Sequence, residues 1–409
     1  YNNIPIAVNN YIVQTQYFGY HPRKTMITAL RFLPLRNMEQ IEIQDVLTPI
    51  ILTGSFFGLI PNSVKFSKSE QRFKIIPKSI YLNILCVAFF LTLHITFLVY
   101  HLYLVFYIEE KRNTSMKLNF AMELVNFLIV SSTTYIYAYV NRAKYLKIFN
   151  MIVSTWSGIP QSPNSRKFLM KLYVSTNMIL IVIVILILLQ IYLNTNQANI
   201  VQKFVIGITL NMPQVIQFCF LAFYTTLVRC ITAILARITE HCKSLKVSDE
   251  ANMSIRQMEL VYMKVFEIKM DINKTFEGPI LASLFQSFHA LVSEAYLIYY
   301  AELHTSDTSK TLVYNNGVWI TCQFIKIYLL SYSGNSLKAE AFKIGEALHY
   351  VSTEGQGLRW MMEVQHFSTM LKYQSMDISV FGYFSLNATL MFNMSASAIT
   401  YLIIMVQFA

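Results

Sequence analysis

Seven apolar stretches of membrane-spanning length constrain this chain more than any other feature of its sequence. A helix needs about 20 mostly apolar residues to cross a hydrocarbon core roughly 30 Å thick. Inside lipid the backbone must also satisfy its own hydrogen bonds, which selects helices over open strands. The stretches are 79–107, 118–140, 171–193, 204–236, 276–301, 312–333 and 381–408. The sequence therefore predicts an all-α membrane protein with seven transmembrane helices.

Composition supports a membrane environment. Of the 409 residues, 55% are hydrophobic and 13% are charged, against about 25% charged in a soluble globular chain. The net charge of +11 is also typical of nucleic-acid-binding proteins, but in so apolar a chain the orientation of the spans explains it better. We expect no nucleic-acid partner. The five cysteines form no CxxC pair, so neither a disulfide framework nor a cysteine metal site is predicted.

The distribution of cations predicts how the spans are oriented. If the amino terminus is cytoplasmic, 27 Lys and Arg residues lie in cytoplasmic segments and five lie outside, while Lys326 falls within the sixth span. Positive charge gathers on the cytoplasmic side of membrane proteins. We therefore expect a cytoplasmic amino terminus and an extracellular carboxyl terminus. A G-protein-coupled receptor has its amino terminus outside, so the charges argue against that class.

An eighth apolar stretch precedes the first span. Residues 46–61 are too few for a comfortable crossing and contain Pro49, Gly54 and Gly58. If this stretch did span, every later loop would be inverted and the charge bias would point the wrong way. The sequence predicts instead a short re-entrant or interfacial helix within a cytoplasmic amino-terminal segment, 1–78.

Cytoplasmic helices are expected on either side of the sixth span. Apolar positions at helical spacing in 243–275 predict a helix that extends the fifth span into the cytoplasmic loop 237–275. Within the segment 334–380, residues 335–373 predict two helical pieces broken at Gly355 and Gly357. Such helices either join subunits or lie along the membrane surface, and we favour assembly.

The last span ends in a distinctive motif. It reads Thr400-Tyr401, five hydrophobic residues, then Gln407-Phe408. This resembles the carboxyl-terminal signature of insect gustatory receptors, a family related to the insect odorant receptors. Asp45-Val-Leu-Thr-Pro and Glu363-Val-Gln-His-Phe resemble other parts of that family more loosely. By topology the resemblance covers essentially the whole chain, and by local motif about a quarter of it.

The same span carries a polar stripe. Residues seven apart share a helix face, which places Asn393, Thr400 and Gln407 together. A stripe of small polar groups fits a pore lining with an aliphatic constriction, although small residues also favour packing between helices. With the resemblance we predict that residues 381–409 form a pore-lining helix. The predicted pore residues are Asn393, Ser397, Thr400, Ile403, Ile404, Gln407 and Phe408.

The resemblance implies a mechanism. Gustatory receptors are similar to odorant receptors in being ligand-gated cation channels, built as tetramers around a pore formed by the last helix of each subunit. It implies a small-molecule tastant, membrane lipid and like or related subunits as partners, with no enzyme activity, cofactor, metal or G protein required. The rival functions are an odorant-gated channel and a small-molecule transporter, of which the latter would tend to show an internal repeat.

A tastant would bind in the six-helix bundle, 79–333, whose external loops are too short to form a domain. Candidates are polar and aromatic side chains in the outer halves of spans two to six, although each could instead make an interhelical hydrogen bond. Buried carboxylates are the most costly of them. The predicted ligand-binding residues are Glu123, Asn126, Gln190, Asn211, Gln214, Glu294, Tyr296, Asn316 and Trp319.

Two properties are left open by the sequence. It does not decide between a sugar, which the aromatic and amide side chains would suit, and a bitter alkaloid stacked on Trp319. The sequon at Asn113 lies in an expected external loop, where glycosylation could reach it. Similar sequons occur in expected cytosolic and membrane regions, so a chance match is the alternative.

Overall fold

The apolar runs form long helices, as their lengths predict. The computed structural model describes residues 41–60, 63–76, 80–108, 114–162, 164–195, 199–245, 253–303, 307–351 and 357–407. Within Glu39–Ala409 these form one compact unit. Asn113 and Phe408 lie outside the described residues, so the structure does not bear on the sequon or on that pore prediction.

Five helical segments of the described chain are long and apolar enough to cross a membrane. They correspond to predicted spans one to four and seven. The segments are α3 (Ile80–Tyr103) with the π turn η3 (Leu104–Ile108), α4 (Thr114–Val140), α6 (Ser165–Thr195), the run α7 (Ile200–Ile206), η4 (Gly207–Asn211) and α8 (Met212–Ser244), and α12 (Ala388–Gln407). This confirms an all-helical membrane architecture with several apolar spans.

The fifth and sixth predicted spans lie inside two much longer helices. Helix α9 runs from Ile255 to Leu303, and α10 from Asp307 to His349. At 1.5 Å per residue they are about 70 Å and about 65 Å long, far longer than a hydrocarbon core. The predicted helical extension of the fifth span is therefore present from Ile255 onward. Polar side chains lower the mean hydropathy of both segments, so hydropathy alone does not identify them as spans.

The break predicted at Gly355 and Gly357 separates α10 from α11 (Leu358–Tyr373). The first helical piece is not a separate helix, since α10 continues without interruption out of the sixth span. Beyond α11 the chain forms a short hairpin of two strands, β3 (Ser379–Val380) and β4 (Phe384–Ser385), each two residues long.

The predicted start of the last span, residue 381, is wrong by seven residues. Phe381 and Gly382 have φ values of 49° and 76°, in the left-handed region that turns a chain and ends regular structure. The helix α12 begins only at Ala388. Hydrophobicity did not separate these residues from the helix because the hairpin is itself rich in aromatic side chains.

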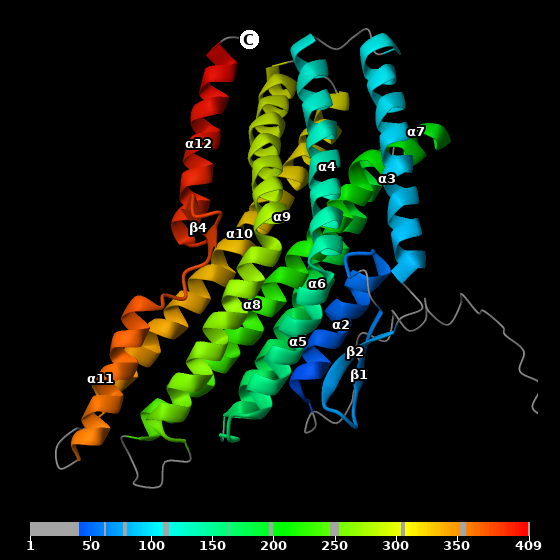
Figure 1. The fold of residues 1–409 in the computed structure, drawn as a ribbon. Helices are drawn as coiled ribbons and strands as arrows, with labels where there is room; N and C mark the ends of the chain where they lie inside the picture. The colour runs from blue at the N-terminus through cyan, green and yellow to red at the C-terminus, as the bar shows by residue number, and fades with distance from the viewer. Residues whose placement is uncertain are drawn as a thin grey trace, which may run out of the picture. The chain divides into compact units, whose positions relative to one another are not determined.

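Helix α2 (Ile43–Phe56) covers most of the predicted short helix 46–61 and ends before Gly58, where φ is 71°. Two further features were not predicted from the sequence pattern. They are α5 (Arg142–Ser157), which follows α4 after the single residue Asn141, and the hairpin of β1 (Ser63–Ser67) and β2 (Arg72–Ile76). In Figure 1, α2 lies level with α5, below α3 and α4. Its depth relative to a membrane stays a prediction.

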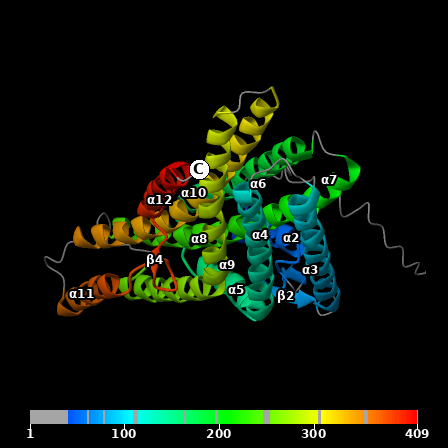
Figure 2. The same cartoon turned by 90° about the horizontal axis from the view of Figure 1, so that it is seen from above.

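Helix α8 is the centre of the core. In its most apolar window 83% of the residues are buried, against 6% for α12. Phe220 and Phe223 of α8 pack on Phe276 of α9, with ring centroids 5.5 and 5.4 Å apart. Figures 1 and 2 both show α3 and α12 far apart, on opposite sides of the long α9.

Candidate functional site

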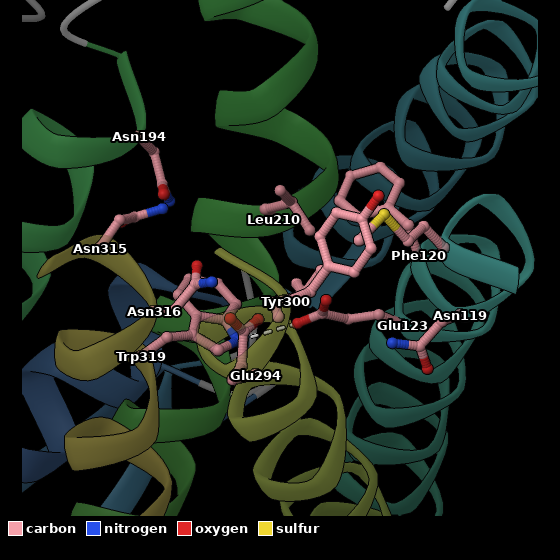
Figure 3. Close-up of a pocket in the computed structure, with 12 residues that line it drawn as sticks. Asn119, Phe120, Glu123, Asn194, Leu210, Glu294, Tyr300, Asn315, Asn316 and Trp319 are labelled. Atoms are coloured by element: carbon pink, nitrogen blue, oxygen red, sulfur yellow. Dashed lines mark hydrogen bonds between the residues drawn. The ribbon is translucent and has the colours of Figure 1, made fainter. Parts of the chain in front are cut away.

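A cavity of about 370 Å³ lies among the helices, lined by the last part of α9, which ends at Leu303, and the first part of α10, which begins at Asp307. Helices α4, α9 and α10 supply most of its wall, with one residue each from α6 and η4. Figure 3 shows the side chains converging on this space. The lining residues are Met116, Asn119, Phe120, Glu123, Asn194, Leu210, Glu294, Leu297, Tyr300, Asn315, Asn316 and Trp319.

A hydrogen bond from α10 to α4 crosses the cavity wall. The indole Nε1–H of Trp319 donates to Oε1 of Glu123 over 2.8 Å. Both side chains are 4% exposed. The Trp319 ring also meets Phe127 edge to face, with centroids 5.8 Å apart. This contact fixes the indole and brings one carboxylate oxygen to the cavity wall.

A second carboxylate faces the same space from α9. Glu294 is 6% exposed, and among the described residues no side-chain hydrogen bond or ion pair reaches it. In Figure 3 the carboxyl groups of Glu123 and Glu294 point toward the same region. Asn316 also lines the cavity, and its buried Nδ2 has no hydrogen-bond partner.

Four of the nine predicted ligand residues line the cavity. They are Glu123, Glu294, Asn316 and Trp319, and the last two share a helix face as their spacing predicts. The other five are buried elsewhere in the bundle. Those five are Asn126, Tyr296, Asn211, which accepts a hydrogen bond from Asn194, and Gln190 and Gln214, which bond to each other.

Eight lining residues were missed by the sequence reasoning. Asn119 carried a usable signal, because it lies one turn before Glu123 on the same face of α4. Its Oδ1 accepts a hydrogen bond from Ser293 of α9 over 2.8 Å. Met116, Phe120, Leu210 and Leu297 had no such signal, since an apolar residue in a span looks the same whether it faces lipid or a cavity.

A buried cation lies in the same bundle. Lys326 of α10 is 0% exposed. Its Nζ lies between 2.5 and 3.5 Å from four glutamine side-chain oxygens. The four are Gln214, Gln217, Gln286 and Gln323. A lone lysine within a span is an expensive residue that calls for partners, and here neutral amides surround it.

Helix α12 has one packed face and one open face. Ala398 is its one buried residue, and Met391, Met394 and Met405 pack partly against the core. Tyr401 meets Phe288 of α9 edge to face at 5.7 Å. All six described members of the predicted pore set, which are Asn393, Ser397, Thr400, Ile403, Ile404 and Gln407, are exposed in the single chain.

The segment leading into α12 is held tightly by α9 and α10. A Cβ at Gly334 of α10 would stand 1.9 Å from the Leu386 carbonyl oxygen, so only glycine permits this approach. Lys338 of α10 forms an ion pair of 2.9 Å with Asp377. Although partial burial opposes it, hydrogen bonds from Ser375 and Lys338 lower the pKa of Asp377.

The described residues offer no group of three or more His, Cys, Asp or Glu side chains that could hold a metal. Four cysteines are buried as free thiols, and Cys86 is exposed.

Comparison with known proteins gives a consistent result. Residues 47–409 match the family model described as 7tm chemosensory receptor. Among curated proteins, the chain is 23% identical over 171 residues to putative gustatory receptor 2a of Drosophila melanogaster, covering 37% of this chain and 40% of that protein. It is 25% identical over 171 residues to putative gustatory receptor 28b of the same species, covering 40% and 36%. Each match thus spans well under half of the relative.

Solved structures share the fold. The insect olfactory receptor OR5 from Machilis hrabei superimposes with a TM-score of 0.69 at 14% identity, over 88% of this chain and 97% of that one. OR5 in complex with eugenol gives the same score over 89% and 98%. At this identity the likeness concerns the fold alone.

Proposed function

Because this chain belongs to the 7tm chemosensory receptor family, we propose that it is a taste receptor that acts as a tastant-gated, non-selective cation channel. The observation that carries the proposal is the open face of α12. Every described residue of the predicted pore set is exposed there, although the helix is apolar enough to cross a membrane.

An exposed polar stripe on a membrane helix needs water or other polar groups. Asn393 and Gln407 carry amide groups that would have no hydrogen-bond partner in lipid. Each such group costs on the order of several kcal/mol in an apolar medium. Four copies of α12 around a central axis would place these amides against water in a pore. We propose a homotetramer, or a heterotetramer with related receptors, in which Ile403, Ile404 and Phe408 form the constriction.

The cavity is the proposed tastant site. Helices α9 and α10 contribute Glu294 and Trp319 to it, and the same two helices hold α12 and its leading segment through Phe288 and Gly334. A ligand that binds more tightly to one arrangement of these helices shifts the population toward that arrangement. The path from cavity to pore thus passes through two continuous helices.

The proposed topology has seven spans, with α9 and α10 as the fifth and sixth. The amino terminus is cytoplasmic and the carboxyl terminus extracellular, as the distribution of Lys and Arg predicts. The protein would reside in the plasma membrane. In this orientation the end of α10 and α11, within 334–380, lie on the cytoplasmic side together with the first part of α9, and they are suited to subunit assembly.

Current recording tests the proposal. The chain is expressed in cells without endogenous chemoreceptors, and cation currents are recorded against panels of sugars and bitter compounds. Unitary, ligand-evoked currents are expected. Good surface expression without current under any agonist argues against a self-sufficient channel, and saturating flux without unitary events indicates a transporter.

The pore assignment is tested with Gln407→Ala. Loss of the amide should change single-channel conductance or ion selectivity by at least twofold. The matched control is Ile399→Ala, which is also exposed on α12 but lies about 100° around the helix from the polar stripe. Equal conductance and selectivity in Gln407→Ala and wild type would refute the assignment.

A further inference from the structure

We propose that the cavity selects an organic amine in its protonated form, with the ammonium group held between Glu123 and Glu294. The inference rests on the proposed function, because it names the ligand class of the proposed tastant site. It follows from the charges, the hydrogen-bonding groups and the walls of the cavity.

The two carboxyl groups lack a salt-bridge partner among the described residues. Glu123 and Glu294 are 4% and 6% exposed, and no salt bridge within 4 Å reaches either one in the described part of the chain. Lys326, the buried cation of the same bundle, is bonded to glutamine oxygens instead. Burial of a carboxylate is costly unless a charge or hydrogen bonds offset it. A cationic occupant supplies that offset.

The hydrogen-bonding groups of the cavity are mostly acceptors. Trp319 occupies one oxygen of Glu123, while no described side chain donates to Glu294. The Oδ1 of Asn315 also lacks a donor. An ammonium group has three donors and no acceptor, which complements this arrangement. A neutral hydroxyl could donate to the same oxygens but would bring no positive charge to the pair of carboxyl groups.

One buried donor indicates a second feature of the ligand. Asn316 is 4% exposed, lines the cavity, and its Nδ2 has no partner. A buried unpaired donor costs about 1–3 kcal/mol, so a ligand acceptor such as a hydroxyl oxygen would stabilise the complex. The preferred ligand is therefore an amine that also carries an acceptor.

The walls and the volume limit the body of the ligand. Phe120, Tyr300 and Trp319 line the cavity, and aromatic faces attract cations as well as apolar groups. At about 370 Å³ the cavity lies toward the small end of ligand sites. An amine with a single ring or a fused pair of rings fits these limits.

Direct binding to the purified full chain tests the inference without relying on current. Equilibrium dialysis measures the Kd of butylamine, tyramine and tryptamine, each beside the alcohol in which a hydroxyl replaces the ammonium group. The variants are Glu294→Gln, which keeps the shape of the side chain, and Glu277→Gln, a control on the same helix outside the cavity. Size-exclusion chromatography checks that both fold.

At least one amine should bind tenfold or more tightly than its alcohol in wild type and in Glu277→Gln. In Glu294→Gln that preference should fall below threefold. The inference is overturned if no amine binds, if alcohols bind as tightly as amines, or if Glu294→Gln keeps the full preference. Should Glu294→Gln not fold, the amine-to-alcohol ratio in wild type decides.

Failure of the inference and failure of the proposed function give different results. Amines that bind to the cavity but evoke no current contradict the channel proposal and leave the ligand class standing. Neutral tastants that open the channel while no amine binds contradict the ligand class and leave the channel standing.

Discussion

Replacement of Arg237 by Met should destabilise the end of the bundle at which α5 packs on α8 by about 2–3 kcal/mol. Arg237 on α8 is 2% exposed. It donates to the backbone carbonyls of Trp156, Ile159 and Pro160 over 3.0, 2.8 and 2.7 Å, and it lies 4.2 Å from the centre of the Trp156 ring. One side chain thus holds the end of α5 against α8.

The magnitude follows from what each carbonyl keeps after the change. The carbonyl oxygen of Trp156 still accepts a hydrogen bond from the backbone N–H of Gly158. The carbonyl oxygen of Pro160 still lies 3.2 Å from Nε2 of His241. The carbonyl of Ile159 loses its side-chain donor, which costs about 1–3 kcal/mol when buried. Loss of the cation–π contact adds about 1 kcal/mol, and the burial of a charge that is no longer required offsets part of the total.

Four buried cysteines provide the assay, because a thiol-reactive dye becomes fluorescent as they are exposed on unfolding. The melting temperature of Arg237→Met should fall by about 5 °C in detergent, on the basis of 2–4 °C per kcal/mol for large domains. The melting temperature of Arg237→Lys, which has fewer hydrogen-bond donors, should lie between those of wild type and Arg237→Met. Arg229→Met is the control on the same helix, since no hydrogen bond to Arg229 occurs in the described chain.

A melting temperature for Arg237→Met within 1 °C of wild type would refute this reasoning. An equal fall in Arg229→Met would also refute it, because it would show that any loss of a cation from α8 has the same effect. Recovery of stability at high salt would point to surface charge rather than to the three carbonyls.

Two further predictions concern the helix α12 and pH. Gly334→Val should abolish ligand-evoked current without loss of surface expression, because the valine side chain would clash with the Leu386 carbonyl. The control Gly345→Val should behave as wild type, because a Cβ at Gly345 would have no atom within 4 Å. Equal currents in the two variants would contradict the prediction. The exposed Lys147 has a raised pKa, chiefly through its hydrogen bond with Asp271, so this pair stabilises the fold below the ordinary lysine pKa of about 10.4 and is lost only as pH rises further. The melting-temperature difference between wild type and Lys147→Met should thus be small, as for exposed pairs, and constant from pH 6 to 9; a difference that changes across this range would count against it.

Several features of the fold and the site were predictable because they depend on neighbouring residues. The length of an apolar run determines whether a helix can cross lipid, so α3, α4, α6, α8 and α12 were found. Helical spacing placed Asn316 and Trp319 on one face, and both line the cavity. The same spacing placed Asn393, Thr400 and Gln407 on one face of α12, and all three are exposed there.

Other features were not predictable because they arise from contacts between distant segments. Gln190 and Gln214 have the same residue type and depth as ligand-binding amides, yet they lie against Cys322 and Lys326 in the structure. The late start of α12 depends on a left-handed turn at Phe381 and Gly382. This turn depends on the pairing of β3 with β4 and on packing against α10, and the hydrophobicity of the sequence does not reveal it.

The sequence by itself determined that this chain belongs in a membrane, which segments are apolar enough to cross it, and which family it resembles. The first two follow from the free energies of transfer of successive side chains from water to lipid, summed along the chain. The resemblance follows from the motif at Thr400–Phe408. Only the tertiary structure decided that Glu123, Glu294 and Trp319 meet, since they come from three helices and two of them are 196 residues apart. The packing of side chains decides which polar groups face each other and which face a cavity, and hydropathy contains no information about that choice.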